Sequence, residues 1–137
     1  MDVPPHLNAL TGEIIGAGIE VHRVFGPGLL ESSYLPCLEH ELRARQLHYV
    51  TQYPVPLIYK GLKLEASYRV DLIVEGQVVV ELKSIERVLA VHEAQLLTYL
   101  RLTGCPVGLL INFNVPKLVD GVVRRANTRC RTDAAGI

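Results

Sequence analysis

Three ionisable side chains within one short stretch could carry out chemistry together. Residues 68–83 read YRVDLIVEGQVVVELK, so Asp71, Glu81 and Lys83 interrupt apolar runs that are typical of β-strands. Glu81 and Lys83 are two residues apart and therefore project from the same face of a strand. Burying acids there is costly unless a cation compensates them. Two carboxylates suit a hard divalent ion such as Mg²⁺, and a neighbouring lysine can position or help deprotonate an attacking water, which together describes metal-assisted phosphodiester hydrolysis.

The register of the hairpin decides whether Asp71 joins this face. A two-residue turn would pair Asp71 with Val80 and send it to the face opposite Glu81. An odd-numbered turn, with Gly76 in a left-handed conformation, pairs Asp71 with Val79 and keeps both acids together. We predict the odd turn, with the two acids as diagonal neighbours roughly 7 to 8 Å apart at the backbone. An exposed strand face with an ion pair on the lysine fits the spacing equally well.

Two helices are predicted before this hairpin. Apolar residues recur at steps of three and four from Leu10 to Phe25, which indicates an amphipathic helix with a start near Thr11. The segment Gly26-Pro27-Gly28 ends it, because proline and paired glycines do not continue a regular helix cheaply. A phosphate-binding loop is the less favoured interpretation, since the segment follows a helix instead of a strand and lacks the third glycine. Since Pro36 is tolerated only in a first turn, the second helix should start between residues 31 and 35 and end near residues 46–48.

The remaining pattern predicts a mixed sheet with helices on its faces. Strands are expected near residues 50–59, 62–74, 77–82, 107–113 and 122–124, and a helix over 91–102. The first three strands read as an antiparallel meander, in which Pro54 and Pro56 restrict the first strand to an edge. The continuous apolar run of 107–113 is typical of a strand covered on both sides.

Composition is that of one ordinary globular domain. The chain has 137 residues, is 49% hydrophobic, and carries 14 basic and 14 acidic side chains for a formal net charge of +0. Whole-molecule attraction to nucleic acid or anionic lipid is therefore excluded, and a polyanion would need a local patch or a metal. We expect an N-terminal segment over residues 1–10, one domain over 11–127, and a frayed tail over 128–137.

The cysteines and the hydropathy pattern favour a soluble, cytoplasmic protein. Cys37, Cys105 and Cys130 are far apart and lack the spacing of a zinc site, so reduced, structural thiols are expected. No stretch reaches the roughly 20 apolar residues that cross a bilayer, so no membrane partner is expected.

Several motifs together resemble a known family. Asp71 followed by Glu81-Leu82-Lys83 resembles the D and ExK halves of the PD-(D/E)xK nuclease superfamily, with Val70 in place of the usual proline. Gln95 and Tyr99 resemble the QxxxY motif of its RecB and lambda-exonuclease branches. Residues 28–34, GLLESSY, fit GxxExxY, the signature of a family of small bacterial proteins in that superfamily. The resemblance covers about residues 10–127.

This resemblance implies a restriction-endonuclease-like α/β fold with an α, β, β, β, α, β core. It implies that Asp71, Glu81 and the backbone carbonyl of Leu82 would hold Mg²⁺ or Mn²⁺, and that Lys83 would be the catalytic lysine. Glu31 would be an acid contributed by the preceding helix, as a ligand or through water. Gln95 and Tyr99, one turn apart, would orient the metal shell or the scissile phosphate.

The expected activity is that of a metal-dependent nuclease, acting on DNA. One alternative is an inactive nuclease-fold module that binds nucleic acid or a protein partner, and another is a hydrolase of small nucleotides. Because a small neutral domain has little surface for wrapping a duplex, a homo-oligomer or a partner protein is also expected.

Basic residues outside the motifs could contact the nucleic acid backbone or could be ordinary solvated charge. They are Arg124, Arg125, Arg129 and Arg131 near the end of the chain, with Lys60, Lys63 and Lys117. The histidines share no metal-ligand spacing and are expected at the surface or as caps, although His92 lies on the predicted helix face of Gln95 and Tyr99 and could line the site.

Overall fold

Five strands form one mixed sheet in the computed structural model, which describes residues 3–128. The elements in chain order are α1 (Pro5–Phe25), α2 (Glu31–Ala44), β1 (Tyr49–Tyr59), β2 (Leu62–Val74), β3 (Val78–Lys83), α3 (Ala90–Thr103), β4 (Val107–Asn112), the short 3-10 helix η1 (Leu118–Gly121) and β5 (Val122–Ala126). The sheet order is β1-β2-β3-β4-β5, and only β3 and β4 are parallel. The predicted mixed sheet, its initial meander and the edge position of β1 are confirmed.

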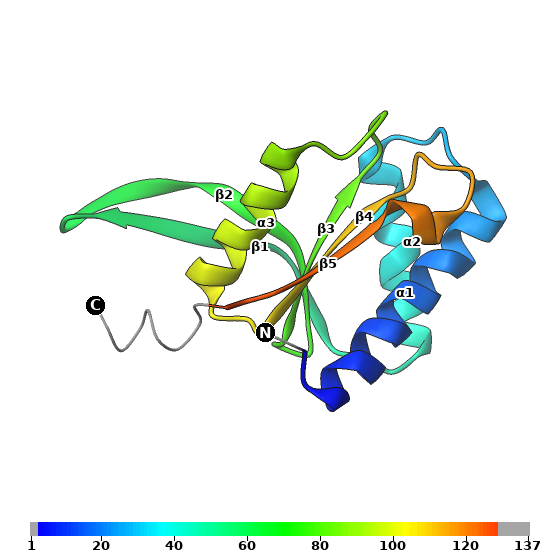
Figure 1. Cartoon of the computed structure of the whole chain (residues 1–137), viewed down its shortest axis with the longest axis horizontal. Helices are drawn as coiled ribbons and strands as arrows, with labels where there is room; N and C mark the ends of the chain where they lie inside the picture. Colours follow the sequence, from blue (N-terminus) through cyan, green and yellow to red (C-terminus); the bar gives the residue numbers. More distant parts are fainter. Residues whose placement is uncertain (1–2, 129–137) are drawn as a thin grey trace.

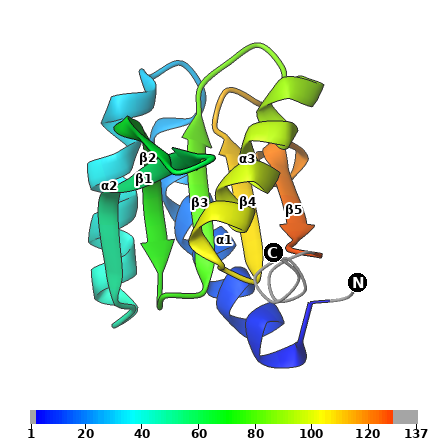
Figure 2. The same ribbon diagram turned by 90° about the vertical axis from the view of Figure 1, so that its left-hand side faces the viewer.

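The helices form layers on both faces of the sheet. Helices α1 and α2 cover one face and α3 covers the other, as Figure 1 and the turned view in Figure 2 show. Every residue of β4 is buried between these layers, as the continuous apolar run predicted. Alternate side chains of β3 divide between two cores, with Val78 and Val80 packed toward α1 and α2, and Val79 packed toward α3. No helix among residues 3–128 is long and apolar enough to cross a bilayer.

Helix α1 starts earlier than expected, and α2 ends at Ala44, earlier than the expected residues 46–48. Helix α1 begins at Pro5, well before Thr11, because a proline at the first helical position has its φ already set and needs no N–H partner. This extra turn also buries Leu7 in the core. Helix α2 begins at Glu31, within the expected range, but Pro36 lies beyond the first turn. Because a proline has no backbone N–H, the Ser32 carbonyl lacks the helical hydrogen bond that residue 36 would otherwise donate.

A buried tyrosine fixes the loop between α1 and α2. Tyr34 is fully buried and stacks on Phe113, with ring centroids 4.2 Å apart. Its hydroxyl donates to the Gly26 carbonyl at 2.6 Å and accepts the Leu29 N–H at 3.2 Å. The tyrosine of the GxxExxY pattern therefore holds the loop that delivers Glu31, the first residue of α2.

The β1–β2 hairpin extends beyond the rest of the sheet. Strand β2 pairs with β1 along most of its length, but its register with β3 covers only residues 72–74. The outer part of the hairpin therefore projects past the sheet on the α3 side, as Figure 1 shows. Of the expected frayed tail, residues 129–137 lie outside the described residues, as does Cys130. Cys37 and Cys105 are free thiols.

Replacing Tyr34 by phenylalanine should destabilise the fold. The substitution keeps the ring but leaves the Leu29 N–H and the Gly26 carbonyl without this partner, which costs about 1–2 kcal/mol. Urea denaturation should show a lower midpoint for Tyr34→Phe than for the wild type. Tyr59→Phe, at a tyrosine 61% exposed, is the matched control and should leave the midpoint unchanged. Equal midpoints for the two variants would contradict this account of the loop.

Candidate active site

The turn between β2 and β3 places both acids on the same face. Glu75 and Gly76 both adopt left-handed conformations, with φ of 55° and 64°, and the Gln77 N–H donates to the Val74 carbonyl at 2.9 Å. Because Val74 pairs with Val78, three residues lie in the connection, so the odd turn and the left-handed Gly76 are confirmed.

The exact register differs from the expectation. Leu72 pairs with Val80, so continuing the ladder sets Asp71 opposite Glu81 instead of opposite Val79. The expected diagonal arrangement is therefore wrong by two positions. Val74 stays in the strand, paired with Tyr49 of β1 and with Val78 of β3, so the turn begins one residue later. The Glu75 N–H donates to the carbonyl of His48, which lies just before β1.

Beyond the pair Leu72 and Val80, the strands β2 and β3 separate. There the carboxylates of Asp71 and Glu81 accept the hydrogen bonds that backbone carbonyls would accept in a regular sheet. The Asp71 N–H donates to Glu81 Oε2 at 2.8 Å, and the Leu82 N–H donates to Asp71 Oδ2 at 2.8 Å. Each acid thus binds the opposite strand. These bonds use one oxygen of each carboxylate and leave Asp71 Oδ1 and Glu81 Oε1 for other ligands.

Burial makes this pair of acids unfavourable as a pair of anions. Glu81 is only 6% exposed. Burial raises the pKa of Glu81 to about 8, and the negative charge of Asp71 adds to the shift. The pKa of Asp71 is also raised, mainly by burial, although the Leu82 N–H opposes the shift. A positive charge placed between these carboxylates would remove the cost.

Lys83 and Glu31 lie within electrostatic reach of the pair. The positive charge of Lys83 lowers the pKa of both acids, whereas the negative charge of Glu31 raises both. Lys83 shares the strand face of Glu81 because the two are alternate residues of β3. Ser84, the next residue along, donates its hydroxyl to the Leu29 carbonyl at 2.7 Å and so ties the end of β3 to the loop before α2.

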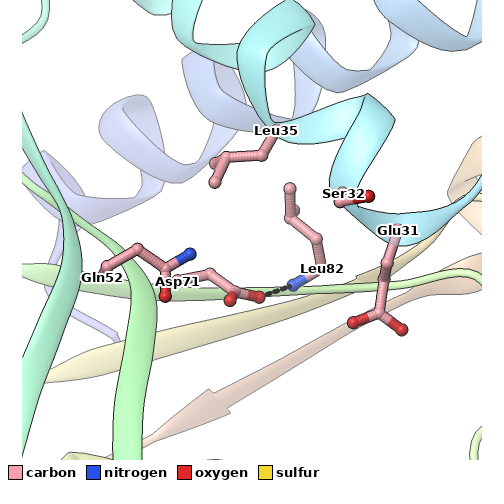
Figure 3. A pocket seen from close by; sticks show the side chains of 6 residues that line it. All are labelled: Glu31, Ser32, Leu35, Gln52, Asp71 and Leu82. Atoms are coloured by element: carbon pink, nitrogen blue, oxygen red, sulfur yellow. Dashed lines mark hydrogen bonds between the residues drawn. The ribbon is translucent and has the colours of Figure 1, made fainter.

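A small pocket opens beside Asp71, between α2 and the hairpin. Its volume is about 230 Å³, below the roughly 300 Å³ at which ligand pockets usually begin. Figure 3 shows Glu31 projecting from the start of α2 and the Asp71 carboxylate bonded to the Leu82 N–H. The pocket is lined by Glu31, Ser32, Leu35, Gln52, Asp71 and Leu82. It therefore suits a hydrated ion or a phosphate group and little more.

Helix α3 brings the two residues of the QxxxY pattern to the same place. Gln95 Nε2 donates to the Tyr99 hydroxyl at 3.2 Å. Burial raises the pKa of Tyr99, and the negative charges of Glu81 and Asp71 raise it further. The Tyr99 hydroxyl therefore lies within electrostatic reach of the acid pair, on the α3 side of the sheet.

Two residues near the site were not identified from the sequence. Gln52 lines the pocket from β1, where its backbone is left-handed. Buried Asn112 holds the segment after Lys83, because its Nδ2 donates to the Ile85 carbonyl at 3.0 Å and its Oδ1 accepts the Ile85 N–H at 3.1 Å. An asparagine at the end of an apolar strand was the only sequence signal for this role.

The candidate basic residues do not gather at the acid pair. Arg124 donates to the side chains of Asn8 and Thr11, and Arg125 forms a salt bridge with Glu93. Both arginines lie on β5, the sheet edge opposite β1. Lys60 and Lys63 lie on the β1–β2 hairpin, Lys117 lies next to η1, and Arg129 and Arg131 lie outside the described residues.

The histidines serve structural roles where the structure defines their contacts. The Leu89 N–H donates to His92 Nδ1 at 2.8 Å, so His92 caps α3. His22 is buried, against the expectation of a surface or capping residue, and its Nε2 lies 2.8 Å from the Val115 carbonyl oxygen.

The oxygen donors around the acid pair suit a hard divalent ion. Within residues 3–128, no three His, Cys, Asp or Glu side chains converge closely enough to enclose a metal by themselves. The N–H and C=O of one strand residue point to the same neighbour, so the Leu82 carbonyl opens toward Asp71 as its N–H does. Two carboxylate oxygens and this carbonyl could supply part of an oxygen shell around an ion that keeps several waters.

The comparison with family profiles agrees with this geometry. The profile of the PD-(D/E)XK nuclease superfamily matches residues 8–125, which is most of the chain. The chain belongs to the PD-(D/E)XK nuclease superfamily. A search of curated proteins and a search of solved structures each gave no significant match. The resemblance to this superfamily and the restriction-endonuclease-like fold that it implied are therefore confirmed.

Without a divalent ion, the stability of the protein should fall as pH rises through neutrality. Because the pKa of Glu81 is raised from 4.5 to about 8, the folded state binds more protons than the unfolded state between those values. The stabilisation that this bound proton contributes is full below pH 4.5 and is lost toward pH 8. The free energy of unfolding should fall by at most about 1.4 kcal/mol per pH unit for one proton. Urea denaturation in EDTA at several pH values measures this pH dependence of the free energy of unfolding.

The substitution Glu81→Gln should flatten this dependence. The amide oxygen can still accept the Asp71 N–H but cannot be deprotonated. Glu65→Gln, at an exposed position of the hairpin, is the control and should keep the wild-type slope. Identical slopes for the wild type and Glu81→Gln would show that Glu81 is not the group responsible.

Proposed function

We propose that this protein is a Mg²⁺- or Mn²⁺-dependent nuclease that hydrolyses phosphodiester bonds in DNA. The observation that supports the proposal most is the buried acid pair of Asp71 and Glu81, with Lys83 on the same face. We also propose that it belongs to the GxxExxY group of the superfamily, because residues 28–34 match that pattern. Tyr34 binds the carbonyl of Gly26 at the start of the loop before α2, and Glu31 follows the end of that loop.

The metal would be held by oxygen atoms of β2 and β3. Asp71, Glu81 and the Leu82 carbonyl would be direct ligands. Glu31, which projects from the start of α2, would be a further ligand or would bind the metal through water. A divalent ion supplies Lewis-acid polarisation of a phosphoryl oxygen and lowers the pKa of water. The protein supplies the negative charge that selects such an ion.

The remaining side chains would act on water and on the phosphate. Lys83 would donate hydrogen bonds to the attacking water and balance the charge that builds on the phosphoryl oxygens. The Glu31 carboxylate can accept a proton of that water as the water oxygen bonds to phosphorus. The bond from phosphorus to the leaving oxygen breaks, and the leaving oxygen keeps the electron pair and takes a proton from solvent. The Tyr99 hydroxyl, held by Gln95, can donate to a phosphate oxygen on the α3 side.

A nuclease-fold module without turnover is the second candidate. It is favoured by one observation, namely that Asp71 and Glu81 each already bind a backbone N–H, so the fold does not require a metal. Titration calorimetry with Mn²⁺ separates the two candidates. A nuclease should bind Mn²⁺ in a manner that Asp71→Asn abolishes, whereas an inactive module should show no such binding.

The substitution Lys83→Ala should abolish DNA cleavage while leaving Mn²⁺ binding in place. The lysine would donate hydrogen bonds to the attacking water and balance the charge of the phosphate, whereas the acids would bind the metal. Labelled DNA incubated with Mg²⁺ or Mn²⁺ should be degraded by the wild type and remain intact with the variant, a loss of about 10²-fold or more.

Lys117→Ala is the matched control, since this exposed lysine lies next to η1 and lines none of the acid site. It should cleave as the wild type does. Equal cleavage by Lys83→Ala would place the activity elsewhere, and nucleotides cleaved in preference to polymers would favour the small-substrate hydrolase.

The hairpin lysines should contribute more to DNA binding than Arg125 does. Lys60 and Lys63 lie on the exposed hairpin that leads to Asp71, whereas Arg125 is paired with Glu93 on the opposite edge of the sheet. The double variant Lys60→Ala/Lys63→Ala should weaken DNA binding. The slope of log affinity against log salt concentration should decrease by the amount that about two phosphate contacts contribute. Arg125→Ala should change neither quantity. The reverse ranking would place the nucleic acid along β5.

A further inference from the structure

Gln52 has a left-handed backbone conformation in the middle of a strand. Four non-glycine residues among residues 3–128 have positive φ, and three of them, Gln46, Lys60 and Glu75, lie in connections between elements. Gln52, with φ of 50°, lies inside β1. This conformation is unfavourable for a residue with a Cβ and persists only where the surroundings impose it. It is common for such residues to occur at functional sites.

The irregular residue lies directly across the hairpin from Asp71. Thr51 pairs with Leu72 and Tyr53 with Val70, so Gln52 and Asp71 occupy the interrupted position between these pairs. The irregularity also changes the direction of the side chains. Leu72 packs toward α1 and α2, yet Val70, two residues earlier, packs toward α3. Regular alternation would place both on one face, so the strands rotate at Asp71.

The side chain of Gln52 contributes a neutral hydrogen-bond donor to the pocket. Figure 3 shows its amide beside Asp71, with the nitrogen directed into the space below Leu35. The two acids that line this pocket, Asp71 and Glu31, carry oxygen atoms that accept hydrogen bonds when ionised. A phosphodiester entering beside them needs donors. An amide can donate without the positive charge that would pair with Asp71 and compete with a metal.

We propose that Gln52 is a substrate-binding residue whose amide N–H donates to a phosphate oxygen of the polynucleotide next to the acid pair. The proposal rests on the nuclease function proposed above. It also accounts for the backbone of β1, because a left-handed residue at this position rotates the hairpin and turns the amide toward the pocket. Gln52 would thus hold the nucleic acid on the α2 side, opposite Tyr99.

Two substitutions separate the side chain from the backbone. Gln52→Leu keeps a side chain of similar bulk but removes the donor, and Gln52→Gly removes the side chain while relieving the positive φ. Both should weaken the binding of a fluorescein-labelled oligothymidylate in Ca²⁺, measured by fluorescence anisotropy, by about tenfold. Gln52→Gly should nevertheless unfold at the same or a higher urea concentration than the wild type. A purely structural role could not produce this combination.

Gln46 offers a matched control, because it is also an exposed glutamine with positive φ, at 60°, and it lies beyond the end of α2. Gln46→Leu and Gln46→Gly should bind the oligonucleotide as the wild type does. Wild-type affinity in both Gln52 variants would overturn the proposal while leaving the nuclease function intact. Weaker Mn²⁺ binding by Gln52→Leu, measured by calorimetry without DNA, would also overturn it by making Gln52 part of the metal site. A wild type that neither binds nor cleaves the oligonucleotide would overturn both proposals.

Discussion

Where β2 and β3 part, the backbone N–H of each strand is bound by a carboxylate of the other. This exchange between Asp71 and Glu81 replaces the ladder hydrogen bonds that the diverging strands can no longer form. It holds two acids together in a buried place, at the cost of a pKa for Glu81 raised to about 8. The rest of the site follows from this constraint, because a buried pair of acids must retain a proton or receive a cation.

Elements from both helix layers converge on this point. Tyr34 and Ser84 fix the loop before α2 and so bring Glu31 to the open end of β3. On the other face, α3 places Tyr99 where burial, and after it the negative charges of the acid pair, raise the pKa of its hydroxyl. A site reached from both faces of a sheet is possible only where two strands separate, which explains why the chemistry lies at the divergence of β2 and β3.

The hairpin beyond this divergence is shaped by a local exception to strand geometry. At Gln52 the backbone of β1 is left-handed, and across from it Leu72 and Val70 of β2 pack toward opposite faces of the sheet. Natural sequences depart from regular geometry mainly at functional sites, where strain is compensated by the surrounding structure. The expected pairing of Asp71 with Val79, which made Asp71 and Glu81 diagonal neighbours, was wrong because turn chemistry specifies an odd connection but not which residue leaves the strand first.

The sequence by itself determined which side chains share a face. Alternation places Glu81 and Lys83 together, and Gly76 specifies a left-handed turn, because both rules depend only on neighbouring residues. The tertiary structure alone decided how distant segments meet. It brought Gln52, with a left-handed backbone that the residue type does not predict, to the pocket beside Asp71, and it paired Arg125 with Glu93 of another element. Such contacts depend on the packing of elements far apart in the chain, which a local pattern does not specify.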